Sequence, residues 1–308
     1  MRNAFVSKLS ELARSDDRVI LITADLGYGL FDTFRKNFPN QFLNVGVAEQ
    51  NMIGIASGLA LEGYVPFCYS IANFSFMRCL EQIRNDVCYH ELNVTIVSNG
   101  AGFSYGPLGM SHHATEDISI MRAIPNIEVL IPATPIDTEY LTNYAYKSNK
   151  PSYLRLDKSK ISLDNSRTTQ HAWELLVGGD EICFIACGGI VDEALKASAE
   201  MKAKFSINAK VISVKQIILN SDTRLTELLS GVRLVLTLEE NVRSGGLGSY
   251  ILEQLNDNNM DIKVIRLGID DKYESIVGDQ QYLRRINGLT SDEVVNVVTS
   301  HLGIKENK

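Results

Sequence analysis

Two short stretches of the sequence carry side chains that could exchange protons with a ligand. Glu49 precedes the apolar, small-residue run 52–56, so its carboxylate is expected to face a partly buried surface. An apolar environment favours the neutral carboxyl form, which a group that shares a proton near neutral pH requires. His112 and His113 stand side by side in a second stretch, and an imidazole can orient a substrate oxygen or stabilise developing negative charge. These residue types predict acid–base chemistry.

Structural roles for the same residues stay open. A carboxylate in the first turn of a helix compensates the helix dipole, which is an ordinary role for Glu49. The two histidines could equally be a satisfied pair within a loop. Adjacent histidines do not have the i,i+4 spacing of a HExxH zinc site, so we predict no metal ligands in this chain.

The placement of these residues along the chain strengthens the chemical interpretation. Segments with reactive or aromatic side chains directly follow four predicted strands, at residues 25–27, 46–51, 69–78 and 105–117. In open α/β sheets, ligands bind at the carboxyl ends of the strands. We therefore expect the four segments to meet at one edge of a sheet.

The elements that would position these segments alternate between strand and helix. Strand candidates are 19–25, 42–45, 65–70, 93–99, 127–133 and 151–156. The N-terminal run 1–17 reads as an amphipathic helix, and helical patterns follow at 49–61, 74–89, 115–122 and 135–148. Repeated strand–helix units predict a mostly parallel, doubly wound sheet.

A second alternation begins after a polar, aperiodic segment. Its strand candidates are 181–188, 209–214, 233–240 and 262–268, and its helix candidates are 191–203, 222–229, 246–255 and 291–301. We predict an α/β fold with two doubly wound, mostly parallel sheets, in domains 1–160 and 173–308 joined by a linker at 161–172. The glycine-rich run 244–248 lacks the GxxxxGK[ST] and complete GxGxxG patterns, so we interpret it as a tight strand-to-helix turn.

Composition excludes several classes of protein. The 308 residues are 45% hydrophobic and 22% charged, as in soluble globular proteins, and the net charge of -7 would not attract nucleic acid. Five cysteines without a CxxC pair predict neither a disulfide framework nor a zinc site, which fits a reducing cytoplasm. No run approaches the roughly 18–20 apolar residues of a membrane span, so we expect no membrane segment.

Four motifs together resemble the transketolase family. The run NVGVAEQNMIGIASGLALEGYVPF (44–67) resembles its thiamine-binding signature, and YGPLGMSHHATEDISIMRAIPN (105–126) resembles its histidine-bearing substrate loop. FSFMRCLEQIRND (74–86) is similar to its aromatic-to-helix segment, and TLEENVRSGGLGS (237–249) to a turn of its C-terminal domain. The motifs occur in the family's order over nearly the whole chain.

The resemblance implies thiamine diphosphate chemistry centred on Glu49. The family's equivalent glutamate hydrogen-bonds N1′ of the aminopyrimidine and favours the imino tautomer, whose 4′ nitrogen removes the thiazolium C2 proton. Phe74 best matches the phenylalanine that stacks on that ring, with Phe76 second, although either could be a core residue. Further cofactor-binding residues implied by the resemblance are Asp25, Arg78 and Tyr105.

The resemblance also implies residues that contact the sugar substrate. His112 matches the histidine that hydrogen-bonds donor oxygens in transketolases. The usual Thr-His-Gln is replaced by Ser111-His112-His113, which leaves open which histidine contacts substrate. Asp117 and Arg155 match positions that hold substrate hydroxyls or phosphate, for which a planar guanidinium is well suited. An ordinary ion-pairing role for these two residues stays open.

One part of the family's cofactor site has no match in the sequence. A Gly-Asp-Gly followed by Asn binds the diphosphate and Mg²⁺ through oxygen ligands, and only 179–181 and 278–280 approach it. The resemblance therefore implies the C-terminal subunit of a two-chain transketolase. Its partner would be an N-terminal subunit that holds Mg²⁺ and the diphosphate, in an α2β2 assembly.

The leading functional hypothesis is transfer of a two-carbon ketol unit between sugar phosphates or activated sugars through a thiamine diphosphate adduct. The nearest enzymatic alternative is the β subunit of a thiamine-dependent 2-oxoacid dehydrogenase. The AEQNM and SHHATED runs resemble the sugar-handling side of the superfamily instead. A deoxyxylulose-phosphate synthase normally carries both halves of the cofactor site on one chain. From a different class, a non-catalytic subunit that retained the fold stays open.

Overall fold

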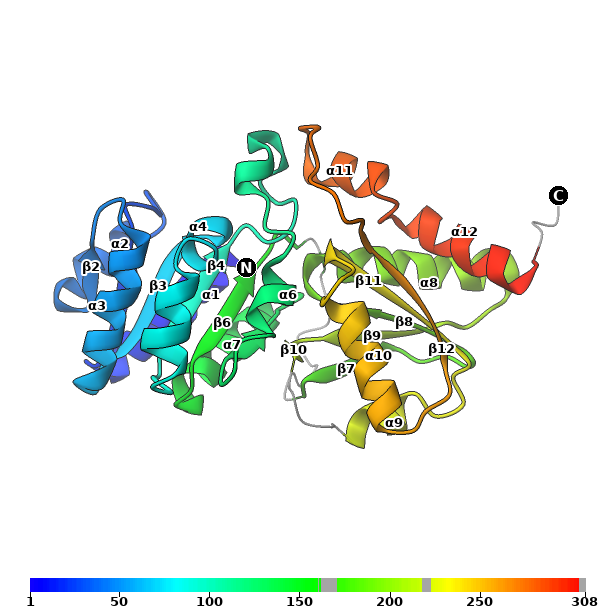
Figure 1. Ribbon diagram of the computed structural model, residues 1–308, viewed down its shortest axis with the longest axis horizontal. Coiled ribbons are helices and arrows are strands. Elements are labelled where there is room, and N and C mark those ends of the chain that lie inside the picture. The colour runs from blue at the N-terminus through cyan, green and yellow to red at the C-terminus, as the bar shows by residue number, and fades with distance from the viewer. Residues whose placement is uncertain (160, 162–170, 218–222, 305–308) are drawn as a thin grey trace.

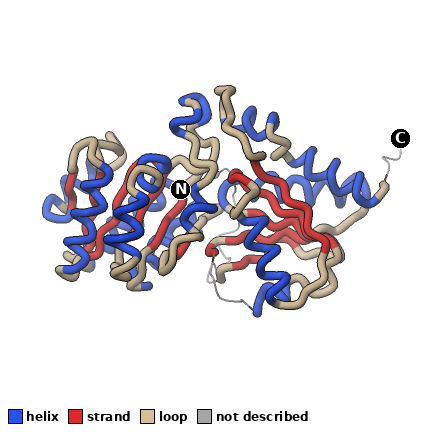
Figure 2. Tube along the Cα trace, viewed as in Figure 1, coloured by secondary structure: helices blue, strands red, loops and turns tan. Residues whose placement is uncertain are grey.

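The computed structural model describes residues 1–159, 161, 171–217 and 223–304. They form two α/β units side by side, each around its own sheet (Figure 1). Helices pack on the faces of both sheets, as Figure 2 shows. The predicted fold, two mostly parallel sheets of the α/β class, is confirmed. The predicted linker at 161–172 lies largely outside the described residues, so the domain boundaries stay a prediction.

The first sheet has seven strands in the order β10-β5-β6-β4-β3-β1-β2. Its strands are β1 (Val19–Thr23), β2 (Phe42–Asn44), β3 (Val65–Ile71), β4 (Thr95–Asn99), β5 (Glu128–Leu130), β6 (Ser152–Leu156) and β10 (Gln216–Ile217). The first six match the strands predicted from the sequence, and they pair in parallel. Their carboxyl ends consequently lie along one edge of the sheet.

Helices cover both faces of this sheet, so its central strands β3, β4 and β6 are almost entirely buried. On one face α1 (Arg2–Ser15) packs against α7 (Pro135–Ser148). Helices on the other face include α3 (Glu49–Leu61), α4 (Ala72–Phe76), α5 (Leu80–Gln82), the π-helical turn η2 (Ile83–Cys88) and α6 (Asp117–Met121). The predicted helix 74–89 is thus divided into three pieces. The short elements α2 (Asp32–Asn37) and η1 (Pro39–Gln41) connect β1 to β2.

The second sheet has the order β12-β11-β8-β9-β7, with β7 antiparallel to β9. Its strands are β7 (Trp173–Val177), β8 (Ile182–Ala186), β9 (Lys210–Val214), β11 (Leu234–Val242) and β12 (Lys263–Ile269). Its helices are η5 (Gly188–Ile190), α8 (Val191–Phe205), α9 (Thr223–Leu228), α10 (Leu247–Asp257), α11 (Gln280–Ile286) and α12 (Ser291–Leu302). The sequence did not predict β7 or α11.

The glycine-rich run 244–248 is the strand-to-helix turn that the sequence predicts. The Glu239 carboxylate accepts hydrogen bonds from the amides of Leu247 at 2.6 Å and Gly248 at 2.8 Å, at the start of α10. A Cβ at Gly246 would overlap this carboxylate, so glycine is required there. The first amides of α10 are therefore satisfied by the chain itself. Burial raises the pKa of Glu239 to about 8.

The two units share more than a chain connection. Strand β10 comes from the second half of the sequence but pairs antiparallel with β5 of the first sheet, with Ile217 opposite Val129. One continuous hydrophobic cluster includes Ile53 and Ile118 of the first unit together with Trp173 and Tyr250 of the second. Because core packing crosses the boundary, the second unit holds a defined position against the first.

Candidate active site

Glu49 lies at the carboxyl edge of the first sheet. It is the first residue of α3, which begins five residues after the last residue of β2, Asn44. The helix packs its apolar side chains, including Met52 and Ile53, into the core, and this packing draws its first turn inward. Only 2% of the Glu49 surface is exposed. The prediction that this carboxylate faces a partly buried surface is confirmed.

Arg78 is the cation that compensates this buried carboxylate. Its Nη1 donates a hydrogen bond to Oε2 of Glu49 at 2.7 Å, while 49% of the Arg78 side chain is exposed. The Arg78 Cζ lies 5.0 Å from the ring centroid of Phe74, a cation–π distance. Arg78 therefore joins the carboxylate to an aromatic face.

Phe74 and Phe76 have different environments. Phe74 is half-buried and its ring centroid lies 5.2 Å from that of His112, in an edge-to-face arrangement. Phe76 is fully buried and packs 6.0 Å from the ring of Tyr153, within the core. Of the two aromatic candidates, only Phe74 can offer a ring face to a ligand beside Glu49.

The two adjacent histidines are also distinguished by burial. His112 is half-buried, with Nδ1 3.0 Å from the Ser111 hydroxyl. His113 is buried against the Phe103 ring at 5.2 Å, and its Nε2 lies 3.4 Å from the Gly106 carbonyl oxygen. Burial lowers the pKa of His113, which favours a neutral ring. His112 is thus the histidine that a ligand at Phe74 could reach.

Asn73 is a site residue that the sequence did not identify. Its side-chain amide donates to the Ser111 carbonyl oxygen at 2.8 Å, which ties the aromatic segment to the loop that carries His112. In the sequence, Asn73 could have been recognised as a candidate because it directly precedes Phe74. Glu49, Phe74, Arg78 and His112 are therefore brought together by contacts among β2–α3, α4 and the loop after β4.

Asp25 and Tyr105 lie at the same edge but have other partners. Asp25 accepts hydrogen bonds from Tyr28 at 2.7 Å and from the Asn44 amide at 3.1 Å, and these bonds lower its pKa. The Tyr105 hydroxyl accepts from the Asn99 amide at 2.5 Å. These hydrogen-bond partners, Tyr28, Asn44 and Asn99, are not members of the group formed by Glu49, Phe74, Arg78 and His112. Cofactor contacts for Asp25 and Tyr105 stay predictions.

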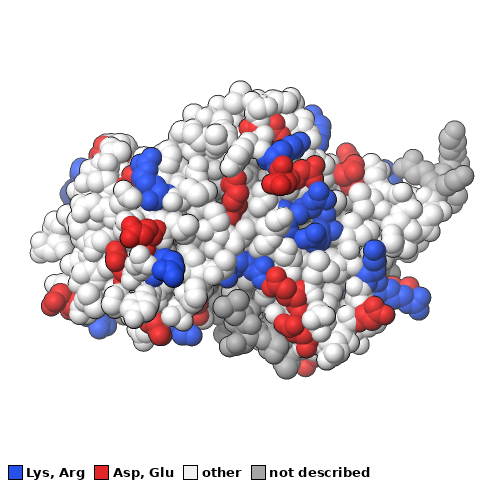
Figure 3. All heavy atoms as spheres, in the orientation of Figure 1, with Lys and Arg blue, Asp and Glu red and all other residues white. Residues whose placement is uncertain are grey.

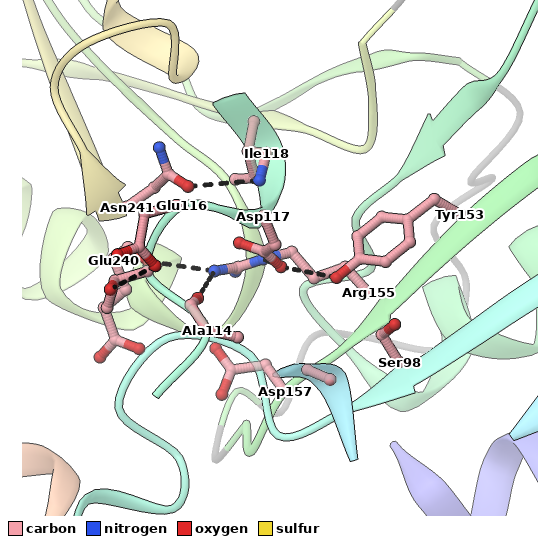
Figure 4. A network of polar contacts seen from close by, with 12 residues as sticks. Ser98, Ala114, Glu116, Asp117, Ile118, Tyr153, Arg155, Asp157, Glu240 and Asn241 are labelled. Carbon is pink, nitrogen blue, oxygen red and sulfur yellow. Dashed lines mark hydrogen bonds and ion pairs between the residues drawn. The ribbon is translucent and has the colours of Figure 1, made fainter. Parts of the chain in front are cut away.

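Asp117 and Arg155 form a buried ion pair, which does not support the substrate-binding prediction. Arg155 Nε donates to Asp117 Oδ2 at 2.7 Å, and the Tyr153 hydroxyl donates to the same oxygen at 2.8 Å (Figure 4). The exposed fractions of Asp117 and Arg155 are 0% and 1%. Burial alone would lower the pKa of Arg155, but the adjacent Asp117 carboxylate raises it overall. Both side chains are thus buried and paired with protein groups in this structure, and a substrate contact for either stays a prediction.

On the face shown in Figure 3, basic and acidic groups are interspersed. Across the described ranges, no three His, Cys, Asp or Glu side chains are grouped so as to hold a metal ion. In the same part of the chain, every helix is too short or too polar to cross a bilayer.

Comparison with known families agrees with this architecture. Residues 1–162 match the family described as "Transketolase, pyrimidine binding domain", and residues 171–294 match "Transketolase, C-terminal domain". This chain belongs to the transketolase family, as the sequence motifs predicted.

Relatives of similar length are described as subunits or sections. The chain is 31% identical over 295 residues to an apulose-4-phosphate transketolase subunit of Actinobacillus succinogenes, covering 95% of this chain and 94% of the relative. It is 32% identical over 308 residues to a "Putative transketolase C-terminal section" of Methanocaldococcus jannaschii, covering 98% and 96%. A 1-deoxy-D-xylulose-5-phosphate synthase of Clostridium perfringens is also 32% identical, and the match covers 96% of this chain but 48% of that enzyme.

Solved structures show the same fold. The structure titled "Split gene transketolase, inactive beta4 tetramer" superposes with a TM-score of 0.83 at 31% identity, covering 99% of this chain and 98% of the other. The transketolase from Leishmania mexicana superposes with a TM-score of 0.79 at 21% identity, covering 96% of this chain and 44% of the other. The second likeness concerns the fold alone.

Proposed function

We propose that this chain is one subunit of a two-chain, thiamine diphosphate-dependent transferase that moves a two-carbon ketol unit from a ketose donor to an aldose acceptor. The observation that carries the proposal is the contact series Glu49–Arg78–Phe74–His112. It combines a buried carboxylate, an accessible aromatic ring and an imidazole. This combination suits a flat heteroaromatic ring bound beside a polar substrate.

The same four residues fit the pyrimidine half of the cofactor. The nearly buried carboxyl of Glu49 would share a proton with a ring nitrogen, and Phe74 would stack on the ring. Arg78 bonds Oε2 of Glu49 in this structure, and the second carboxyl oxygen, Oε1, would be the one to meet a ring nitrogen. When bound, thiamine diphosphate supplies the nucleophilic carbon that carries the two-carbon unit.

We assign orientation of the donor sugar to His112. Its Nδ1 faces Ser111, so Nε2 is the ring nitrogen left to hydrogen-bond a sugar oxygen. A sugar phosphate or an activated sugar would fit this proposal. His113 is buried against Phe103 and serves the loop rather than the substrate.

The proposal includes a partner chain that binds the diphosphate and Mg²⁺. Support comes from the relatives. The match covers 94% of a protein that is named as a transketolase subunit. It covers 48% of a synthase whose name does not describe it as a subunit. The complementary chain would bring the other half of the site, in an α2β2 complex. Its setting would be the cytoplasm, where the five buried, unpaired cysteines would remain reduced.

The test mixes this chain with a diphosphate-domain partner and measures thiamine diphosphate binding by calorimetry and ketol transfer by product formation. Glu49→Gln should lower transfer by at least about 100-fold in the mixture, because the shared proton is lost. Glu62→Gln, at the exposed end of the same helix, is the matched control and should leave transfer unchanged.

Three outcomes separate the possibilities. Transfer only in the mixture, lost with Glu49→Gln, supports the proposal. Turnover by this chain alone would overturn the need for a partner. Absence of cofactor binding in any mixture would leave a non-catalytic subunit as the better account of the fold.

A further inference from the structure

The loop that carries His112 touches the second unit along most of its length. This histidine loop, residues 100–116, includes η3 (Gly106–Leu108) and η4 (Met110–His112). In Figure 1 it rises in teal beside the orange segment 270–279, which precedes α11. A Cβ at Gly106 would overlap the Gly278 carbonyl oxygen, so the two segments are in direct contact. The conformation of the loop therefore depends on residues far away in the sequence.

Glu240 is a charged group of the second unit that contacts this loop directly. Its Oε2 accepts a hydrogen bond from the Phe103 amide at 3.3 Å. Gly102 has a φ of +54°, and a Cβ there would overlap the Glu240 side chain. Glycine is therefore required at this position both for its backbone angle and for the approach of the carboxylate.

Glu240 is itself held rigidly although it is a buried acid. Only 2% of its surface is exposed, and burial raises its pKa despite the neighbouring cation. Arg284 of α11 forms an ion pair with Oε1, and the Gln280 amide donates to Oε2 at 2.9 Å. A buried carboxylate is stable only with such partners, so its geometry is closely defined.

A second link runs in parallel through Asp157. The Gln280 amide also donates to Asp157 Oδ1 at 3.1 Å, and that oxygen accepts the Ser104 hydroxyl at 2.6 Å. Figure 4 shows Glu240 and Asp157 facing the same region of the interface. Phe103 and Ser104 are thus bonded at two successive points to one polar network, which joins Asp157 of the first unit to Gln280 and Glu240 of the second.

A short series of contacts links the Glu240–Phe103 hydrogen bond to His112. Phe103 packs against the His113 ring at 5.2 Å, and His113 Nε2 lies 3.4 Å from the Gly106 carbonyl oxygen. His112 directly precedes His113 in the chain, and its ring centroid lies 5.2 Å from that of Phe74. An anchor at Phe103 therefore sets where the imidazole of His112 lies relative to the Phe74 ring.

We propose that Glu240 is a positioning residue, which holds the histidine loop through Phe103 and His113 so that His112 faces Phe74. The catalytic importance of this contact rests on the proposed function. The contact itself concerns only this chain and can be measured without cofactor or partner.

The test follows the His112 ring by NMR in the isolated full-length chain with ¹³C-labelled histidine. His112→Gln assigns its Cε1–H resonance, and Phe74→Leu measures the ring-current shift that Phe74 imposes on it. In Glu240→Ala we expect most of that shift to disappear. Glu240→Gln keeps an oxygen acceptor for the Phe103 amide, so it should retain more of the shift than alanine does.

Asn241→Ala is the matched control. Asn241 crosses the same interface, but it bonds the Ile118 amide at 3.2 Å and the Ser119 hydroxyl at 2.8 Å, outside the histidine loop. The Asn241→Ala substitution should weaken the interface between the two units and leave the ring-current shift of His112 unchanged. If Glu240→Ala does not fold, Gln280→Ala removes one support of the carboxylate and should reduce the shift in part.

The outcomes are distinct from those that test the proposed function. Persistence of the shift in a folded Glu240→Ala chain would overturn the positioning role, as would equal loss in Asn241→Ala. The His112 shift could be lost in the Glu240 variants alone while no mixture of chains supports ketol transfer. That result would support the positioning contact and overturn the proposed function. In an active mixture, Glu240→Ala should lower kcat by about tenfold to 100-fold, with partial rescue by Glu240→Gln.

Discussion

The guanidinium of Arg78 donates a 2.7 Å hydrogen bond to Oε2 of Glu49, a carboxylate with only 2% of its surface exposed. The same guanidinium lies over the Phe74 ring at 5.0 Å. In this conformation Arg78 occupies the Glu49 oxygen and lies against the Phe74 ring, the two groups that the proposed cofactor would contact. A pyrimidine ring bound between these groups would therefore lie beside Arg78.

Removing Arg78 should destabilise the free chain. Arg78→Ala leaves a buried carboxylate without its cation, and we expect the free energy of unfolding to fall by about 1–2 kcal/mol. In a Glu49→Gln background the same substitution should cost less, because no buried charge is left. Urea unfolding of the four proteins in this double-mutant cycle measures the difference, with exposed Arg84→Ala as control. Equal costs in both backgrounds would contradict the pairing.

The two phenylalanines should respond in opposite ways to truncation. Phe76→Ala opens a cavity in the core and should lower the free energy of unfolding by about 3–5 kcal/mol. Phe74→Ala removes a half-buried ring, so it should cost less stability and mainly weaken thiamine diphosphate binding in the mixed complex. Thermal unfolding and calorimetric titration separate the two effects. A stable Phe76→Ala chain with impaired cofactor binding would reverse the assignment.

Arg155 should behave as a structural cation. Arg155→Ala leaves Asp117 buried and unpaired, and we expect a loss of about 3–5 kcal/mol in the free energy of unfolding. Arg155→Lys should restore only part of it, because the guanidinium also donates from Nη2 to the Glu240 carbonyl oxygen at 3.0 Å. A substrate-binding role would instead leave stability unchanged and raise KM.

Glu239 should make stability depend on pH. Its pKa is raised from 4.5 to about 8 in the folded chain, so the folded state keeps a proton that the unfolded state releases. This contribution is fully present below about pH 4.5 and is lost as the pH rises to about 8, with a slope of at most about 1.4 kcal/mol per unit.

Denaturant unfolding from pH 5 to pH 8 measures the Glu239 effect. Glu239→Gln removes the titrating group, so the difference between wild type and variant should shift in favour of the variant as the pH rises. The exposed Glu139→Gln shows the effect of deleting one surface carboxylate. A constant difference across this range would mean that Glu239 is ionised in the folded chain.

Local sequence patterns were sufficient for much of the fold and part of the site. Apolar periodicity predicted β1–β6 and the main helices, because a strand or helix buried on a sheet must repeat its apolar residues with the period of that element. Glu49 and the aromatic segment could be placed at the carboxyl edge because parallel strands end together. The signal failed for α11, whose sequence QQYLRRI is short and mostly polar.

Other features depended on contacts between distant residues. Ser111-His112-His113 has the same local chemistry at both histidines, and only packing against Phe103 buries one and leaves the other beside Phe74. Asp117 and Arg155 have types that suit a substrate site, yet the docking of the second unit encloses them. Burial and pairing are properties of the assembled interface rather than of any local segment. The sequence by itself therefore determined the class of fold and the residues able to do the chemistry, and tertiary packing decided which of them face a ligand.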